Sequence, residues 1–200
     1  VQPHLPDSQM DLDALEHTIT PKTKAVIVNS PNNPSGVVYT AEVLEGLARL
    51  LEKKSGEYGS TIYLITDEPY REIVYDGIRV PYLTKYYKDT LVCYSYSKSL
   101  SLPGERIGYI VIPSRLTDYK RVSPAIAGAA RVLGFVCAPA LFQQVVARCV
   151  EDTGDIEAYK HNRDLLLNGL TELGYACVPP QGAFYLFVKA LEEDAYAFCE

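Results

Sequence analysis

Three short stretches of the sequence carry side chains that could act together on one small ligand. Residues 29–36 read NSPNNPSG, residues 66–77 read TDEPYREIVYDG, and residues 95–109 read SYSKSLSLPGERIGY. Together they offer an amine, a carboxylate, a guanidinium, a phenol, an amide and several hydroxyl groups. The amine of Lys98 is close in sequence to Arg106, and a neighbouring cation disfavours the ammonium form of a lysine. A neutral amine is the nucleophile that forms an imine with an aldehyde.

Each stretch begins at the end of an apolar run typical of a buried β-strand. These runs cover residues 24–29, 61–66 and 91–95, and a fourth run covers residues 107–112. In an open parallel sheet, ligands bind beyond the carboxyl ends of the strands. Adjacent strands lie about 5 Å apart, so the polar residues after the first three strands are expected to meet around one ligand.

The combination of groups favours one cofactor, pyridoxal phosphate. A carboxylate opposite the lysine could keep a pyridinium nitrogen protonated, which strengthens this cofactor as an electron sink. An arginine with serine hydroxyls could bind a phosphate. A phenol and an asparagine amide could donate hydrogen bonds to a ring oxygen. No comparable chemistry suggests a metal, so no metal site is predicted.

The three stretches, in their order and spacing, resemble the class I/II aminotransferases of the aspartate aminotransferase family, which are fold-type I pyridoxal-phosphate enzymes. The resemblance covers nearly the whole chain, including the GAFYLFV run at residues 182–188. It implies one role for each of six residues: Asn33 and Tyr70 at the ring oxygen, Asp67 at the ring nitrogen, Ser95 and Arg106 at the phosphate, and Lys98 as the catalytic Schiff-base lysine. It also implies a cis bond between Asn33 and Pro34.

The resemblance implies transamination between an amino acid and a 2-oxo acid. Lys98 would move a proton between the substrate Cα and the cofactor C4′. Two alternatives use the same residues: a carbon–sulfur lyase, and a cofactor-sensing domain of a transcription regulator. Taken singly, each residue has a simpler interpretation: Lys98 as a surface lysine, Asp67 as a turn residue, and Tyr70 as one of 16 tyrosines placed there by chance. The agreement of the three motifs argues against them.

The composition indicates which classes of binding partner and which cellular compartment to expect. The formal net charge is −6 with no basic cluster, which argues against nucleic acid. The five cysteines form no CxxC motif, so a disulfide framework or zinc site is not expected, and a cytoplasmic location fits. No signal peptide is visible. The uncharged run at residues 132–147 is too short to span a membrane and is interpreted as a buried helix pair.

The order of elements predicts an α/β fold with a mostly parallel sheet flanked by helices. Helices are expected over residues 11–17, from Thr40 past Leu51, and over residues 116–133, 139–151 and 156–173. A late strand is expected at residues 183–188, with a helix from about Glu192. Residues 1–150 are predicted to be the C-terminal half of a cofactor-binding large domain, and residues 151–200 a connecting helix and the start of a small domain.

Both ends of this sequence look incomplete. The resemblance places a phosphate-binding helix start and a stacking ring upstream, and the arginine for the substrate carboxylate downstream. The resemblance also implies that the full-length protein is a homodimer. Residues 1–200 alone are expected to be inactive and to expose a sheet edge or an apolar face.

Overall fold

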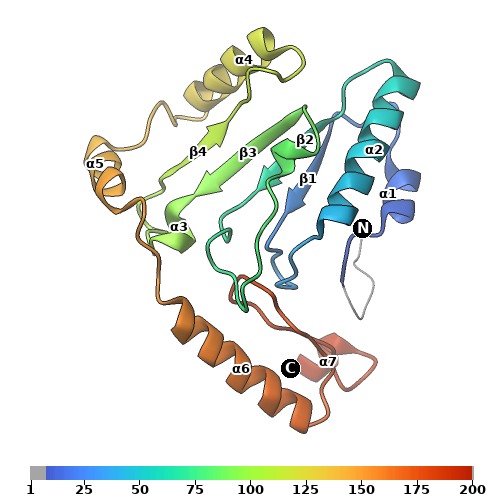
Figure 1. The fold of residues 1–200 in the computed structure, drawn as a ribbon, viewed down its shortest axis with the longest axis vertical. Helices are drawn as coiled ribbons and strands as arrows, with labels where there is room; N and C mark the ends of the chain where they lie inside the picture. Colours follow the sequence, from blue (N-terminus) through green and yellow to red (C-terminus); the bar gives the residue numbers. More distant parts are fainter. Residues whose placement is uncertain (1–7, 200) are drawn as a thin grey trace.

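A four-stranded sheet forms the centre of the molecule in a computed structural model that describes residues 8–199 (Figure 1). The strands lie in the order β1-β2-β3-β4. Their bounds are Ala25–Asn29, Tyr63–Asp67, Thr90–Ser95 and Gly108–Val111. The first three strands are parallel and β4 is antiparallel to β3. The prediction of a mostly parallel sheet flanked by helices is confirmed.

Helices α1 (Leu12–Thr18) and α2 (Ala41–Tyr58) pack with one face of this sheet. Asp11 and Thr40 cap them through hydrogen bonds to Ala14 N and Val43 N, as the sequence predicted. Apolar positions of α2 follow the helical period and face the sheet. We call the resulting cluster the α2 core. Its buried members are Ile19, Val28, Leu44, Leu47, Ala48, Leu50, Leu51, Ile62, Leu64, Leu83 and Tyr87.

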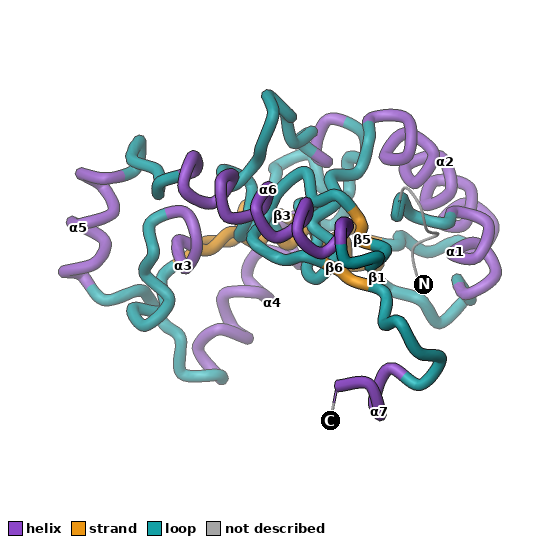
Figure 2. The backbone as a smooth tube through the Cα atoms, turned by 90° about the horizontal axis from the view of Figure 1, so that it is seen from below, coloured by secondary structure: helices purple, strands orange, loops and turns teal. Residues whose placement is uncertain are grey.

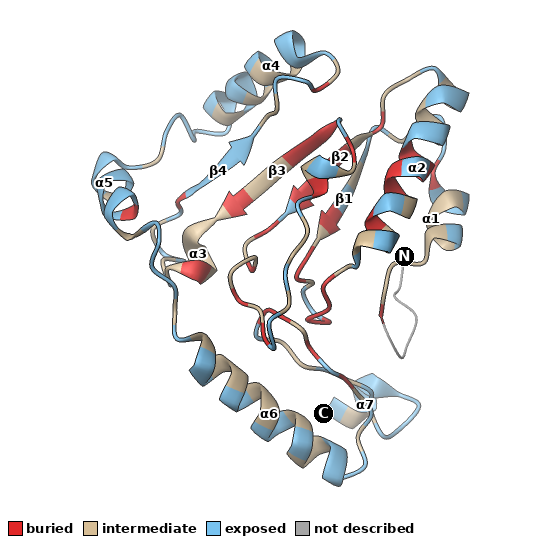
Figure 3. Ribbon diagram, in the orientation of Figure 1, coloured by how far each residue is buried: buried red, intermediate tan, exposed pale blue. Residues whose placement is uncertain are grey.

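The opposite face of the sheet is open over β1 and β4 (Figure 3). Alternate residues of a strand point to opposite faces, so Val28 is buried while its neighbour Ile27 is 71% exposed. All four residues of β4 are exposed as well. The expected apolar face is therefore present.

Helices α4 (Tyr119–Val132) and α5 (Ala140–Cys149) lie at the periphery, beyond β4 (Figure 1). The prediction of a buried helix pair over residues 132–147 is wrong. Val132 and Leu141 are 88% and 69% exposed, and Val146 is the buried residue of α5. Apolar character alone does not say what covers a segment, and no described element covers this one. Within the described residues, no helix is both long and apolar enough to cross a membrane.

The last part of the chain forms α6 (Ile156–Glu172), a two-stranded sheet and α7 (Ala195–Cys199). The small sheet pairs β5 (Cys177–Val178) with β6 (Phe187–Val188), and α6 lies beside it (Figure 2). The predicted strand at residues 183–188 is shorter than expected, and β5 was not predicted. Gly182 instead forms an isolated bridge with Val74, so the chain there pairs with the segment that follows β2.

Candidate active site

The polar ends of the three parallel strands lie side by side, as predicted. The pairing register places Asn29 of β1 opposite Asp67 of β2, and Asp67 opposite Cys93 of β3. The side-chain nitrogen of Asn29 donates to the Asp67 carbonyl at 2.9 Å and to its carboxylate at 3.3 Å. The Asn29 oxygen accepts from the backbone N–H of Asn33 at 2.6 Å. Asn29, which sequence reasoning passed over, thus connects two of the predicted site residues.

The Asp67 carboxylate has no cationic partner among the described residues. Asp67 is exposed, yet partial desolvation raises the pKa of its carboxyl, and the negative charge of Glu68 raises it further. A cation brought to this carboxylate would favour its charged form. The residue therefore suits a protonated ring nitrogen, and its contact with such a nitrogen stays a prediction.

Glu68 follows Asp67 in the sequence, and its side chain is buried. The sequence motifs predicted no role for it. Its carboxylate accepts from Thr66 Oγ1 at 2.9 Å and pairs with Arg71 Nε at 2.5 Å. The Arg71 guanidinium also donates to the carbonyls of Val80 and Pro81. A buried charge needs such partners. The Glu–x–x–Arg spacing in the second motif was the available signal, since it suits an i,i+3 ion pair.

Tyr70 is buried, and its hydroxyl lies 2.6 Å from that of Tyr185. Burial raises the pKa of Tyr70, and the hydrogen bond with Tyr185 raises it further. The nearby Asn33 side chain, a potential donor to the Tyr70 hydroxyl, lowers this pKa. Lys98 Nζ lies 6.0 Å from the ring centre of Tyr70 and 5.3 Å from that of Phe184. Asn33, Tyr70 and Lys98 are therefore brought together.

Two of these neighbours, Phe184 and Tyr185, come from the GAFYLFV run. The rings of both meet the ring of Tyr70 edge-on, with centres 5.5 and 5.6 Å apart. The apolar pattern of this run predicts a strand and does not place its aromatic residues in the site. A segment far from the other motifs in sequence could not be placed beside them by periodicity alone.

Ser95 ends β3 and caps the short helix α3 (Tyr96–Ser99), which carries Lys98. Its hydroxyl accepts from Ser97 N at 3.1 Å and lies 2.6 Å from Ser97 Oγ. After α3 the chain reverses, so that Gly108 pairs with Ser95 and Tyr96 N donates to Ile107 O at 3.1 Å.

This reversal returns the backbone of Arg106 to the beginning of α3. The Arg106 side chain is exposed and donates to the carbonyl of Pro103 at 2.7 Å. No hydrogen bond joins it to Ser95 among the described residues. The fold therefore brings the two predicted phosphate contacts to one loop without bonding them to each other.

The backbone around the GAFYLFV run is tied to the first two motifs. The carbonyl of Gly36 accepts from Gln181 N and Gly182 N at 2.8 and 2.9 Å, and Ala183 N donates to Ile73 O at 2.9 Å. Gly36 has a positive φ of 71°, and a Cβ there would collide with Pro180. The Asn33–Pro34 bond is cis, as predicted.

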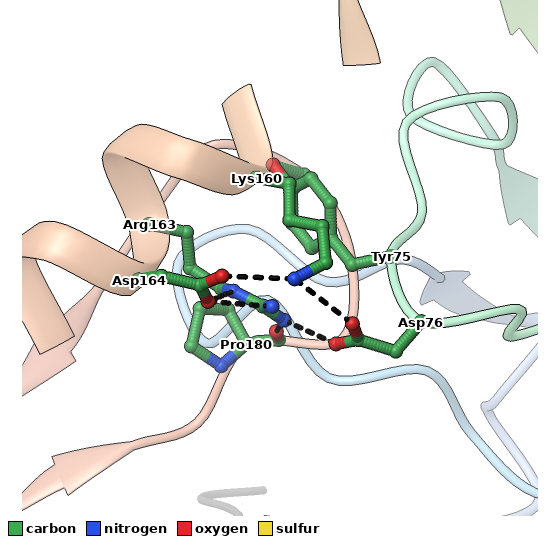
Figure 4. Close-up of polar contacts among 7 residues, drawn as sticks. Tyr75, Asp76, Lys160, Arg163, Asp164 and Pro180 are labelled. Carbon is green, nitrogen blue, oxygen red and sulfur yellow. Dashed lines mark hydrogen bonds and ion pairs between the residues drawn. The ribbon is translucent and has the colours of Figure 1, made fainter. Parts of the chain in front are cut away.

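An ion-pair network ties α6 to the end of the second motif (Figure 4). Asp76 pairs with Arg163 at 2.8 Å and with Lys160 at 3.3 Å. Asp164 pairs with the same two cations, and Arg163 also donates to the Pro180 carbonyl at 3.1 Å. The hydrogen bond from Arg163, assisted by Lys160, lowers the pKa of Asp76.

No group of three or more metal-ligating side chains occurs within residues 8–199. The arrangement instead gathers an amine, a carboxylate without a cation, a phenol and an amide. These groups suit an organic ligand with a basic ring nitrogen and a ring oxygen.

Comparison with known proteins identifies relatives over almost the whole chain. The family model described as aminotransferase class I and II matches residues 2–200. An aspartate/prephenate aminotransferase of Thermus thermophilus is 37% identical over 180 residues, which are 89% of this chain and 45% of that protein. An aspartate aminotransferase of Thermotoga maritima is 32% identical over 96% of this chain and 48% of its own length. The chain spans about half the length of these relatives.

Solved structures agree with this fold. A crystal structure of an amino transferase from Eubacterium rectale has a TM-score of 0.97 and 60% identity, covering 100% of this chain and 50% of that one. The N-succinyldiaminopimelate aminotransferase of Mycobacterium tuberculosis has a TM-score of 0.83 at 29% identity, covering 98% of this chain and 51% of that one.

Proposed function

Since the chain belongs to the family of class I and II aminotransferases, whose members use pyridoxal phosphate, we propose that the full-length protein transfers an amino group between an amino acid and a 2-oxo acid with this cofactor. The observation that carries the proposal is the convergence of Lys98, Asp67, Tyr70 and Asn33 beyond the ends of β1, β2 and β3. The relatives reported above are all named aminotransferases, which favours transamination over lyase or sensing functions.

The described residues fit this cofactor by the chemistry of their donors and acceptors. Asp67 has no cationic partner among the described residues, so its carboxylate is available to accept a hydrogen bond from a protonated ring nitrogen. Asn33 and Tyr70 would donate hydrogen bonds to the ring oxygen. Ser95 and Arg106 would bind the phosphate, with the Arg106 side chain turning from Pro103 toward it.

Lys98 is the proposed catalytic residue. When bound, the cofactor supplies an electron sink that stabilises negative charge at the substrate Cα. Lys98 would link the protein covalently to the cofactor and then, as a free amine, remove the proton from Cα and return it at C4′. The ring of Phe184, 5.3 Å from Lys98 Nζ, limits the directions in which this amine can move.

We extend the proposal to domain organisation, assembly and compartment. Residues 1–150 would belong to the large cofactor-binding domain, and residues 151–200 would connect it to a small domain. A homodimer is supported by the apolar side chains exposed on α4 and α5. A cytoplasmic location is supported by five cysteines that are all free.

The test uses the full-length protein loaded with pyridoxal phosphate. Reduction with borohydride followed by peptide mapping should place the pyridoxyl group on Lys98, and a mapped label on Lys85 or Lys88 would refute its assignment. An assay with aspartate or tyrosine and 2-oxoglutarate should then show sustained amino transfer. Release of a thiol or sulfide from a sulfur-containing amino acid without amino transfer would instead identify a lyase.

A further inference from the structure

The hydroxyl of Tyr70 has two neighbours that can decide where its proton points. It lies 2.6 Å from the hydroxyl of Tyr185, and the Asn33 side chain is near enough to lower the pKa of Tyr70 as a hydrogen-bond donor would. A phenol has one proton to donate and two lone pairs that accept. In the bond between the two phenols only one proton is shared, so either Tyr70 or Tyr185 is the donor.

The two choices have different consequences for the ring oxygen of a bound cofactor. If Tyr70 donates to Tyr185, its proton is no longer available to another acceptor. If Tyr185 donates, and an N–H of Asn33 donates as well, both lone pairs of Tyr70 are occupied. The Tyr70 proton is then directed away from both neighbours. The second N–H of Asn33 remains available to the same ring oxygen.

Several contacts hold Tyr185 in place, so that it can act as the donor in its hydrogen bond with Tyr70. The residues before it are fixed by the bonds from Gln181 and Gly182 to Gly36 and from Ala183 to Ile73. The hydroxyl of Tyr75 also donates to the Ala183 carbonyl. The Tyr185 ring packs edge-on against Tyr70, with an interplanar angle of 82°. A phenol on such a frame loses little further freedom when it forms a hydrogen bond.

We propose that Tyr185 is a positioning residue, which donates its proton to Tyr70 and thereby directs the Tyr70 hydroxyl toward the ring oxygen of the cofactor. This inference rests on the proposed function. The charged or titratable groups that face the Tyr70 hydroxyl or ring are Lys98, Asp67 and Tyr185 itself. Lys98 and Asp67 are retained in every variant below, so the comparison isolates the bond between the two phenols.

The experiment measures the pH midpoint at which the visible absorbance of the bound cofactor changes in the full-length protein. A hydrogen-bond donor to the ring oxygen stabilises the unprotonated form of the chromophore. It therefore lowers the pH midpoint at which the chromophore loses its proton. Tyr70→Phe should therefore raise it, by up to about one pH unit, the equivalent of one neutral hydrogen bond. Tyr185→Phe should raise it in the same direction by a smaller amount. The double variant should match Tyr70→Phe, because Tyr185 acts through Tyr70.

Controls separate positioning from folding. Tyr87→Phe removes a buried phenol that donates to Ile62 at 2.8 Å in the α2 core, and its midpoint should not move. Tyr185→Met removes the ring as well and should shift the midpoint at least as far as Tyr185→Phe. The dissociation constant for pyridoxal phosphate, measured by equilibrium dialysis, should rise in both Tyr185 variants.

The outcomes distinguish this inference from the proposed function. A normal chromophore on Lys98 whose midpoint responds to Tyr70→Phe but not to Tyr185→Phe would overturn the role of Tyr185 alone. Additive shifts in the double variant would also overturn it. A protein that forms no chromophore on Lys98 would overturn both proposals together.

Discussion

The α2 core and the cluster around Tyr70 are both buried, but they are built from different chemistry. Ten of the eleven buried members of the α2 core are aliphatic, and they pack one face of the sheet. The second cluster has Tyr70, Ile73, Tyr75 and Ala183 at its centre, with Tyr159 and Tyr185 packed around it. Its phenols form hydrogen bonds to each other and to the backbone. Burial of apolar surface stabilises the α2 core and has no directional preference. In the second cluster, hydrogen bonds also fix the orientations of the side chains.

This difference predicts that variants of the two clusters fail in different ways. Changes beside Tyr70 should alter chemistry while leaving most of the folding free energy in place. Changes under α2 should lower the free energy of unfolding and leave the chemistry of each folded molecule intact.

The largest effect on chemistry is expected for Lys98→Met in the full-length protein. Loss of the amine removes both the covalent link and the proton transfer, and general acid–base groups alone contribute about 10²–10⁴-fold. Amino transfer should therefore fall by more than about 10⁴-fold in a steady-state assay. Lys22→Met, which changes an exposed lysine away from the site, is the matched control. Retention of more than a few per cent of the activity by Lys98→Met would contradict the assignment.

Asp67→Ala should be the next most severe change. Without the carboxylate, the ring nitrogen loses the partner that keeps it protonated, so the electron sink weakens. Transamination should slow by several orders of magnitude while cofactor binding remains detectable by absorbance. If turnover stays near normal, Asp67 is a turn residue and the contact to the ring nitrogen must be abandoned.

Leu51→Ala tests the other side of the comparison. Leu51 is fully buried in the α2 core, so removing its side chain should cost about 2–5 kcal/mol of unfolding free energy. Urea denaturation should show a lower midpoint with an unchanged slope. Activity per folded molecule should be preserved at low denaturant. Loss of activity in fully folded Leu51→Ala would show that the two clusters are not separable.

The smallest effect concerns the ion pairs between α6 and Asp76. Their cations depress the pKa of Asp76 below its usual value of 3.8, so this stabilisation is present above that pH. It is lost as the pH falls below 3.8 toward the depressed pKa of the folded state. The urea midpoint should therefore drop less between pH 5 and pH 3 in Asp76→Asn than in the unchanged protein. Equal losses in both would mean that Asp76 contributes nothing to the attachment of α6.

Local patterns were sufficient to predict the four main strands and the two helix caps Asp11 and Thr40. The runs before Asn29, Asp67 and Ser95 have the β-branched and apolar composition of buried strands, and each forms one. Motif spacing selected Asn33, Tyr70 and Lys98, and the fold brings these three residues together, while their roles stay predictions. These are features that a few neighbouring residues determine.

The missed features depend on partners that are distant in sequence. Tyr185 gains its place from Tyr70, 115 residues earlier, and β5 exists because Cys177 and Val178 pair with β6. The exposure of Val132 and Leu141 is set by which elements reach them, and their own apolar character carries no such information. Periodicity reports which side of an element is apolar, and it does not report what that side meets.

The hydrogen bonds that join residues 181–185 to the earlier motifs affect the order in which the chain can fold during its synthesis. Val38 and Gln181 are separated by 143 positions, so their hydrogen bond closes one of the longest loops in the chain. During synthesis, β1, α2 and β2 can assemble well before Gln181 leaves the ribosome, because their contacts are local by comparison. The contact between Tyr70 and Tyr185 must wait for the later segment. A nascent chain that already carries Lys98 therefore still lacks part of the proposed cofactor pocket.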